Sequence, residues 1–146
     1  VGFSDGANLA MAFAARYPDA VNKLVLNSGN LLFSGTKPFG RITSYLQYTL
    51  GAALNAISKR FKDVHLKAKL LVEDPDISEE DLRHLRSPSL VIVGSRDVVE
   101  TSHSKYIASL IPHCRYVEVA NEGHRLARTN AKAFNEIVIN FLKGES

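Results

Sequence analysis

Short apolar runs along the chain have the length and composition of buried β-strands. They span residues 24–26, 89–93 and 116–119, and a loop or turn follows each of them. Helical patterns separate these runs. Residues 7–15 are mostly apolar helix formers that stop before Pro18, and further helical patterns cover 101–110 and 131–142. Strands that alternate with helices predict an α/β fold with a doubly wound, mostly parallel sheet.

Residues 31–86 depart from this alternation. They contain no convincing strand, and helical patterns cover 42–61 and 78–85. The sequence Ser78-Glu79-Glu80-Asp81 is typical of a capped helix start. A helical insertion between two strands predicts a lid over a functional site. The alternative is an elaborated connection between strands with no gating role.

A glycine-flanked serine stands at the start of the chain, in Gly2-Phe3-Ser4-Asp5-Gly6. The pattern Gly-x-Ser-x-Gly before a helix predicts a nucleophile elbow, in which the serine adopts a strained conformation with positive φ. Bulky side chains two residues on either side would collide, so we expect Gly2 and Gly6 to provide the space. Ser4 would then stand at a helix N-terminus, which stabilises an anion.

An aspartate and a histidine follow the next two predicted strands in the order Ser…Asp…His. Asp97 comes after the strand at 89–93, and His124 comes after the strand at 116–119. An aspartate at this place can accept the Nδ1–H of a histidine, and that histidine can act as a general base. Alternatively, Asp97 caps the following helix or forms an Asx turn. Less favoured candidates are Asp5 and Glu100 as the acid, and His65, His84, His103 and His113 as the base.

These segments resemble the α/β-hydrolase superfamily, and in particular its serine hydrolases with a helical cap inserted before the acid. The resemblance covers nearly the whole chain and matches the C-terminal portion of the superfamily's core. It implies an elbow with the following helix and strand at 1–30, a cap or lid at 31–86, and the part of the core that carries acid and base at 87–146. Val1 would then end the fifth strand of the family.

The resemblance implies a two-step acyl transfer that cleaves a small-molecule carboxylic ester or a related acyl bond. Ser4 would be the nucleophile, His124 the base and Asp97 its orienting acid, and the backbone N–H of Asp5 would hold the oxyanion. No metal and no organic cofactor is implied. Serine at the elbow argues against the dehalogenase and epoxide-hydrolase branches. The alternatives are a non-catalytic ligand-binding protein, or an acyltransferase or perhydrolase with the same triad.

An apolar acyl pocket is a further expectation, because such sites are mainly apolar. Its candidate lining residues are Phe3, Phe33, Tyr45 and Tyr48. Packing within the cap is the alternative explanation for the three that lie in residues 31–86.

The composition of the chain indicates a globular domain and limits the partners that we expect. The chain has 146 residues, of which 45% are hydrophobic and 23% charged, as is usual for globular domains. The net charge is only +3, and we interpret the basic run at 59–62 as a solvent-exposed helix face. We therefore expect no nucleic-acid partner. No run is long enough to span a bilayer, and the single Cys114 favours a reducing compartment, so we expect a cytoplasmic protein. A homodimer is possible.

The chain begins at Val1, in the middle of a motif, and we expect it to be the C-terminal part of a longer protein. The four preceding strands of the family would then be missing, together with the loop that gives the second oxyanion donor. The loss of one such donor costs about 10²–10³ in rate, so we expect weak or no activity of this chain alone.

Overall fold

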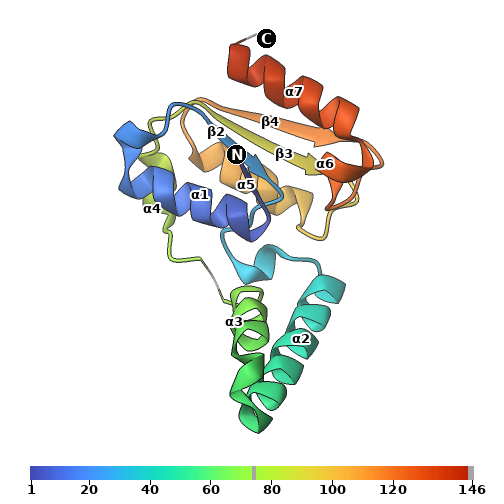
Figure 1. Cartoon of the computed structure of the whole chain (residues 1–146). Coiled ribbons are helices and arrows are strands. Elements are labelled where there is room, and N and C mark those ends of the chain that lie inside the picture. Colours follow the sequence, from blue (N-terminus) through green and yellow to red (C-terminus); the bar gives the residue numbers. More distant parts are fainter. Residues whose placement is uncertain (74, 145–146) are drawn as a thin grey trace.

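The computed structural model describes residues 1–73 and 75–144, and its centre is a parallel sheet of four strands (Figure 1). The strands are β1 (Gly2–Phe3), β2 (Leu24–Asn27), β3 (Ser89–Gly94) and β4 (Cys114–Val119), and they lie in the order β1-β2-β3-β4. Leu26 pairs with Gly2 on one side and with Val91 on the other, which sets the register at the centre of the sheet. The predicted α/β fold with a parallel sheet is confirmed.

Helices cover both faces of the sheet. One face carries α1 (Asp5–Arg16), α4 (Glu79–Arg83) and α5 (Thr101–Leu110), and the other carries α6 (Leu126–Thr129) and α7 (Ala131–Lys143) (Figure 1). The side chains of β2 alternate between these layers. Leu24 and Leu26 pack toward α1, whereas Val25 packs toward α7. Both central strands are buried throughout, so the core lies on the two sides of β2 and β3.

Several predicted element boundaries agree with the structure. Helix α5 covers the predicted residues, α7 extends one residue further, and α1 stops before the short 3₁₀ turn η1 (Pro18–Ala20). The expectation that Val1 ends a strand is wrong, since β1 covers the next two residues. Strand β4 begins two residues earlier than predicted, because it pairs with β3 along its whole length.

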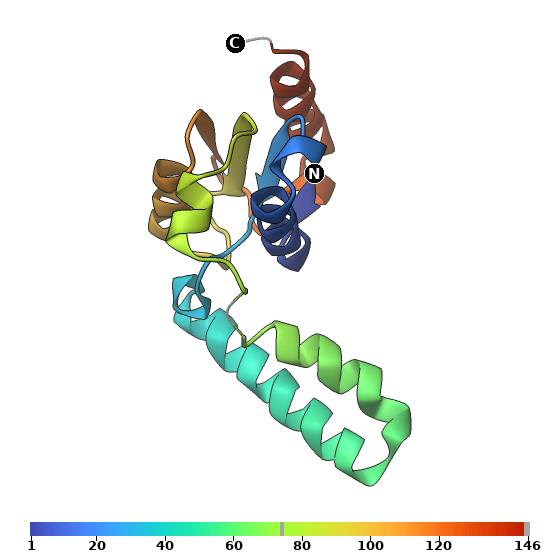
Figure 2. The ribbon, with the colours of Figure 1, turned by 90° about the vertical axis from the view of Figure 1, so that its left-hand side faces the viewer.

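A helical hairpin projects from the sheet layers (Figures 1 and 2). It consists of η2 (Phe33–Gly35), α2 (Pro38–Ile57), η3 (Lys59–Phe61) and α3 (Lys62–Leu70). The predicted single helix over 42–61 is wrong at both ends. Proline fits the first turn of a helix, so α2 begins at Pro38. It ends at Ile57, because the next residue, Ser58, has an extended backbone with φ −151°. The two long helices meet where Gly51 lies against the backbone of His65.

Helix α4 packs with the sheet body. Ser78 and Asp81 form the expected capping box, and the buried side chains of Leu82 and Leu85 join the core beside α1 and α5. The division into segments 1–30, 31–86 and 87–146 stays a prediction. Residue 74 of the second segment and residues 145–146 of the third lie outside the described part of the chain.

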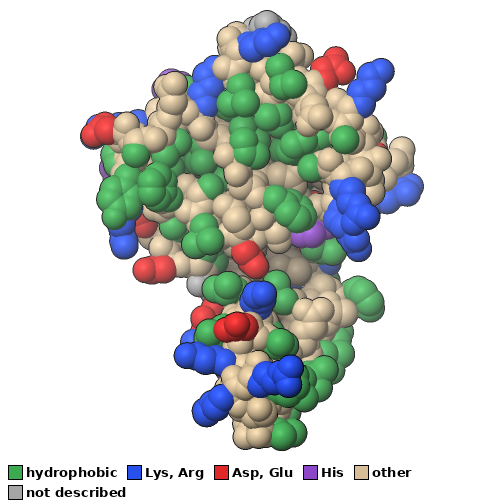
Figure 3. Space-filling view, viewed as in Figure 1, with side chains coloured by type: hydrophobic (Ala, Val, Ile, Leu, Met, Phe, Trp, Pro, Cys, Tyr) green, Lys and Arg blue, Asp and Glu red, His purple; other side chains and the backbone are tan. Residues whose placement is uncertain are grey.

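Large apolar side chains are exposed both on the body and along the hairpin (Figure 3). On α1 the side chain of Leu9 is 69% exposed, and on α2 that of Phe39 is 78% exposed. A search of the helices over residues 1–73 and 75–144 finds none with the length and apolar character that a membrane crossing needs.

Candidate active site

Ser4 stands at a sharp turn between β1 and α1. Its φ of 54° and ψ of −124° place it in a strained backbone conformation, with the positive φ that the motif predicts. The turn is held from both sides. The Ser4 N–H donates to the carbonyl oxygen of Asn27 over 2.9 Å, and the Ser4 carbonyl oxygen accepts the Ala7 N–H over 2.8 Å. The elbow is thereby tied to β2 and to the first turn of α1.

The two glycines of the motif have different roles. A Cβ added at Gly2 would lie 2.3 Å from the carbonyl oxygen of Gly6 and 2.6 Å from the Cα of Ala7, so only glycine fits there. A Cβ at Gly6 would meet no atom within 4 Å. The expectation that Gly6 provides necessary space is therefore wrong in this chain, because that position faces away from the turn's contacts.

Asp97 follows β3, and its side chain is buried. The carboxylate oxygen Oδ1 accepts the backbone N–H of Val99 over 3.1 Å, which closes the Asx turn that was the alternative role for this residue. The other oxygen, Oδ2, accepts the hydroxyl of Ser28 over 2.5 Å. Burial is the largest influence and acts to raise the pKa of Asp97. The hydrogen bonds from His124, Ser28 and the Val99 N–H, together with the charge of His124, outweigh it, and the pKa lies below its ordinary value.

His124 lies between the other two residues. Its Nδ1 is 2.8 Å from Asp97 Oδ1, and its Nε2 is 3.1 Å from Ser4 Oγ. The carboxylate is an acceptor, which assigns the proton to Nδ1 and leaves Nε2 to accept the Ser4 hydroxyl. The ring of Phe3 lies 4.9 Å from the His124 ring, centroid to centroid. The structure thus brings together the three residues that the sequence singled out.

Backbone contacts between two loops hold the acid and the base together. The Arg96 N–H donates to the Glu122 carbonyl oxygen over 2.8 Å, and the Ser95 N–H donates to the Val119 carbonyl oxygen over 3.0 Å. Gly94 makes this approach possible, because a Cβ there would lie 2.2 Å from the Glu122 oxygen. These contacts set the distance between the loop after β3 and the loop after β4.

Asp5 is the first residue of α1, directly after Ser4. A helix leaves its first N–H groups without acceptors inside the helix, so the Asp5 N–H has no acceptor within α1. Burial raises the pKa of the Asp5 carboxyl, and the charge of His124 acts in the opposite direction.

The remaining predicted aromatic residues lie at the hairpin. Phe33 and Tyr45 contact each other edge to face, with centroids 5.2 Å apart, and Tyr48 packs on His65 at 5.3 Å. Tyr48 therefore packs between α2 and α3, which fits the alternative explanation of packing within the hairpin. Among the predicted substrate-contacting residues in the described part of the chain, Phe3 is the one with a ring contact to His124.

The less favoured acid and base candidates have other contacts. His84 Nδ1 lies 2.8 Å from the Glu80 carbonyl oxygen on the surface, and His103 Nε2 lies 3.1 Å from the Leu31 nitrogen. Glu100 precedes α5, and its backbone N–H donates to the carbonyl oxygen of Gly35. These contacts belong to helix ends and to the base of the hairpin.

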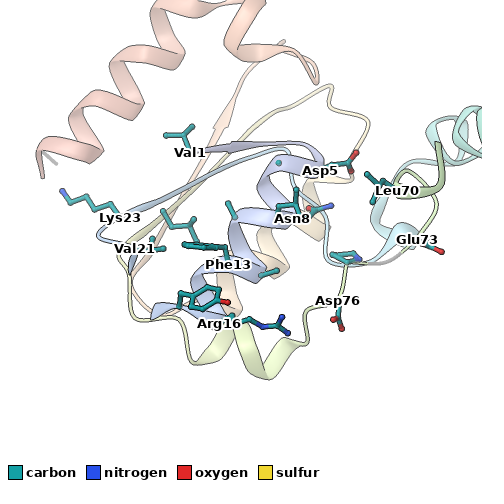
Figure 4. A pocket seen from close by; sticks show the side chains of 17 residues that line it. Val1, Asp5, Asn8, Phe13, Arg16, Val21, Lys23, Leu70, Glu73 and Asp76 are labelled. Atoms are coloured by element: carbon teal, nitrogen blue, oxygen red, sulfur yellow. The ribbon is translucent and has the colours of Figure 1, made fainter. Parts of the chain in front are cut away.

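A surface pocket runs along α1, and Figure 4 shows its lining side chains. Its walls include Phe13 and Arg16 of α1, Lys23 before β2 and Leu70 at the end of α3 (Figure 4). Asp5 also lines it, whereas Ser4, Asp97 and His124 do not. The hydrogen-bonded side chains of the candidate active site therefore lie outside the lining of this pocket.

Asn27 and Ser28 lie at the carboxyl end of β2, and the sequence pattern marks them only as part of a turn. Catalytic groups of parallel sheets gather at the carboxyl ends of strands. That rule, applied to every strand, would have singled out these two polar residues.

The order of the parallel strands and the helices on both faces of the sheet define a class: the chain has the α/β-hydrolase fold. An α/β hydrolase enzyme from a Medee basin deep-sea metagenome library superposes with a TM-score of 0.75 at 20% identity, covering 99% of this chain and 64% of its own. An enol-lactonase from Burkholderia xenovorans superposes with a TM-score of 0.67 at 20% identity, covering 97% of this chain and 64% of its own.

Curated sequences give further similarities. A Caulobacter protein named as a carbamate hydrolase, RutD, is 28% identical over an alignment of 178 positions that covers all of this chain and 65% of that protein. The polyketide synthase ThaQ of Burkholderia thailandensis is 37% identical over 62 residues, 42% of this chain and 3% of the synthase. No family model matches the chain. The chain spans less than two thirds of the length of each of these four proteins, and its origin in a longer protein stays a prediction.

Proposed function

We propose that this chain carries the catalytic triad of a serine hydrolase that cleaves small-molecule carboxylic esters or related acyl bonds. The observation that carries the proposal is the double contact of His124, whose two ring nitrogens lie within hydrogen-bond distance of Ser4 and Asp97. A nucleophile, a base and a group that orients the base are the three parts that this chemistry requires.

In the proposed reaction, Ser4 Oγ attacks the acyl carbon and His124 Nε2 takes the hydroxyl proton. Asp97 accepts the Nδ1–H, keeps the ring in this tautomer and stabilises the imidazolium that forms. The histidine then returns the proton to the leaving oxygen, which departs as an alcohol. A water molecule, deprotonated by His124, attacks the acyl-enzyme and releases the acid, which restores Ser4.

The elbow supports the same reaction electrostatically. The Asp5 N–H and the N-terminal end of α1 lie directly after Ser4, where the oxyanion of the tetrahedral intermediate would form. Phe3 lies against the His124 ring and forms an apolar side of the site. The N–H and the helix end would stabilise the oxyanion of any acyl substrate, and the Phe3 ring favours an apolar group next to the carbonyl.

Similar proteins support the choice of bond. The names of two of them refer to a lactone and to a carbamate, and both kinds of molecule contain an acyl carbon bonded to oxygen. We propose that this chain acts on the same general class of bond. Their names point to different substrates, so we propose no individual substrate.

Labelling with a fluorophosphonate probe, followed by peptide mapping, tests the proposal. We expect the label on Ser4 in the unaltered chain and no label in His124→Ala. The matched control is Ser109→Ala, which removes an exposed hydroxyl bonded to a carbonyl of its own helix and should leave labelling unchanged. Label on another serine, or equal labelling of His124→Ala, would contradict the assignment.

Product analysis with a competing alcohol tests the fate of the acyl group. Free acid as the main product supports hydrolysis, whereas a new ester as the main product supports acyl transfer. If the unaltered chain binds an ester analogue but Ser4 takes no fluorophosphonate label, it is a ligand-binding protein, and the proposed reaction is wrong.

A further inference from the structure

We propose that Ser28 is a positioning residue that holds the Asp97 carboxylate in line with His124, and that Asn27 in turn orients the Ser28 hydroxyl. The inference deepens the proposed function and rests on it for the consequence in catalysis. The hydrogen-bond chain itself, Asn27–Ser28–Asp97–His124–Ser4, is a statement about structure that can be tested without any turnover.

Three groups hold the Asp97 carboxylate from different directions. Its Oδ1 accepts from His124 Nδ1 over 2.8 Å and from the Val99 N–H over 3.1 Å, and its Oδ2 accepts from Ser28 Oγ over 2.5 Å. The Val99 bond lies within the acid's own loop. The Ser28 bond comes from the end of β2, the neighbouring strand, so it fixes the rotation of the carboxylate relative to the sheet.

The Ser28 hydroxyl is buried and has two close oxygen neighbours. Besides Asp97 Oδ2, the assigned Asn27 Oδ1 lies 2.9 Å away. A hydroxyl has one proton, so it can donate to only one of these oxygens, and the ionised carboxylate is the stronger acceptor. As assigned, the amide oxygen would then face the Ser28 oxygen with no proton between them.

The amide nitrogen of Asn27 also lacks a suitable contact in this assignment. Its Nδ2 is buried and has no hydrogen-bond partner among the described residues. The oxygen and nitrogen of an amide are assigned from their surroundings, so exchanging them is allowed. After the exchange, Asn27 Nδ2 donates to Ser28 Oγ, and the Ser28 proton is directed to Asp97. The amide oxygen then takes the place of the unpartnered nitrogen, and a buried acceptor without a partner is the less unusual of the two.

The backbone at Ser28 supports a role for its hydroxyl. Ser28 has a φ of 56°, a conformation that glycine adopts without strain and that costs free energy in other residues. Its N–H donates to the Ile92 carbonyl oxygen of β3 over 3.2 Å, which holds the turn in place. Ser28 therefore combines a strained backbone with a side chain that contacts the candidate acid, Asp97.

Ser28→Ala tests the inference, because it removes the hydroxyl and leaves the same backbone strain. Ser28→Gly is the second variant, and it removes the hydroxyl while relieving that strain. The matched control is Ser89→Ala, which removes another fully buried serine hydroxyl from the sheet, one bonded to the Ser87 carbonyl oxygen at the start of β3.

The first measurement is the titration of the Asp97 carboxyl carbon by ¹³C NMR in the whole chain. A hydrogen bond to the ionised form favours that form, so its loss should move the Asp97 midpoint upward by about one pH unit in both Ser28 variants. Asn27→Asp should move the midpoint in the same direction, because a second carboxylate competes for the Ser28 proton. The Ser89→Ala midpoint should equal that of the unaltered chain. An unchanged midpoint in both Ser28 variants overturns the inference.

The second measurement is ester turnover. Because Ser28 contacts the acid and not the substrate, we expect kcat to fall about tenfold in both Ser28 variants while KM stays within about twofold. A rise in KM at constant kcat would overturn the positioning role. If the unaltered chain neither turns over esters nor labels, while the Asp97 midpoint still shifts, the proposed function fails and the hydrogen-bond chain stands.

Discussion

The backbone N–H of Arg96 donates to the carbonyl oxygen of Glu122 over 2.8 Å, and this bond joins the loop of the candidate acid to the loop of the candidate base. Asp97 and His124 each lie within two residues of this hydrogen bond. The distance of 2.8 Å between Asp97 Oδ1 and His124 Nδ1 is therefore set largely by the backbone. The side chains then need little conformational freedom to meet, which keeps the entropic cost of their contact low.

Gly94→Ala should disrupt this arrangement. Its new Cβ would lie 2.2 Å from the Glu122 carbonyl oxygen, a backbone atom that can yield only if the His124 loop moves. We expect a loss of stability of about 1–3 kcal/mol in urea unfolding, together with loss of fluorophosphonate labelling. The control is Gly123→Ala, whose Cβ would meet the Arg96 carbonyl oxygen at an ordinary 3.7 Å. Equal effects of the two variants would show that this close approach does not matter.

The elbow glycines provide a second matched pair. Gly2→Ala places a Cβ 2.3 Å from the Gly6 carbonyl oxygen, so we expect it to destabilise the chain by about 1–3 kcal/mol. Gly6→Ala adds a Cβ in open space within α1, where alanine is favoured over glycine by about 0.5–1 kcal/mol. We therefore expect opposite shifts of the unfolding midpoint, and a loss of stability in Gly6→Ala would contradict this view of the turn.

Asp97→Asn should keep the shape of the site and remove the function of the acid. An amide can donate to His124 Nδ1, which favours the wrong ring tautomer, and the imidazolium loses its counter-charge. We expect the kcat for ester turnover to fall by about 10³–10⁴-fold. Glu100→Gln, a change in a nearby carboxylate whose contacts lie at the start of α5, should leave kcat within about twofold. Comparable losses in the two variants would remove Asp97 from its assigned role.

Stability should depend on pH through the same carboxylate. The pKa of Asp97 lies below its ordinary value near 3.8, because the hydrogen bonds of the folded state outweigh the effect of burial. The unfolded chain therefore binds this proton more readily than the folded one. The contribution of Asp97 to stability is present above the ordinary value and disappears as the pH falls through the lowered folded value.

Urea unfolding between about pH 6 and pH 2 measures this effect. We expect the free energy of unfolding to fall with decreasing pH, and to fall less steeply in Asp97→Asn than in the unaltered chain. Asp81 lies on the surface, and hydrogen bonds from Ser78 lower its pKa. Its protonation therefore also lowers the free energy of unfolding as the pH falls. A variant pair with Asp81→Asn alone and combined with Asp97→Asn separates the two contributions. Identical slopes with and without Asp97 would show that its hydrogen bonds are absent in solution.

Cys114 should react slowly with thiol reagents. Burial raises the pKa of its thiol from about 9.0 to about 11, so at pH 8 the thiolate is about a hundredfold scarcer than in an ordinary cysteine. We expect alkylation by iodoacetamide to be slower than in the urea-unfolded chain by about that factor. The difference should shrink as the pH rises toward 11. A native rate equal to the unfolded rate would mean that the start of β4 is open to solvent.

Local patterns predicted most of the architecture. Helix α5 and strand β3 were predicted nearly residue for residue, because periodicity, Pro88 and the glycine at position 94 mark their ends within a few residues. The hairpin was predicted less well. The break after Ile57 depends on how α2 turns to pack against α3, and no local breaker such as proline or glycine marks it.

Some features of the candidate site could likewise be predicted from local sequence, and others could not. The order Ser4, Asp97, His124 could be read from three local motifs at the ends of strands, and their catalytic role stays a prediction. The contact of Ser28 with Asp97 could not be read in this way, since the two residues are 69 positions apart in the chain. The sequence also could not show which of Gly2 and Gly6 provides the space at the elbow, because this depends on the atoms that the turn brings close.

The sequence by itself determined the alternation of strands and helices, the α/β class and the identity of the three candidate residues. Each of these depends on side-chain periodicity or on residues that are neighbours in the chain. Only the tertiary structure decided the approach of the loops after β3 and β4 and the support of Asp97 from the end of β2. Parallel strands bring their carboxyl ends to one edge of the sheet, but the register and the turns that follow decide which atoms meet there.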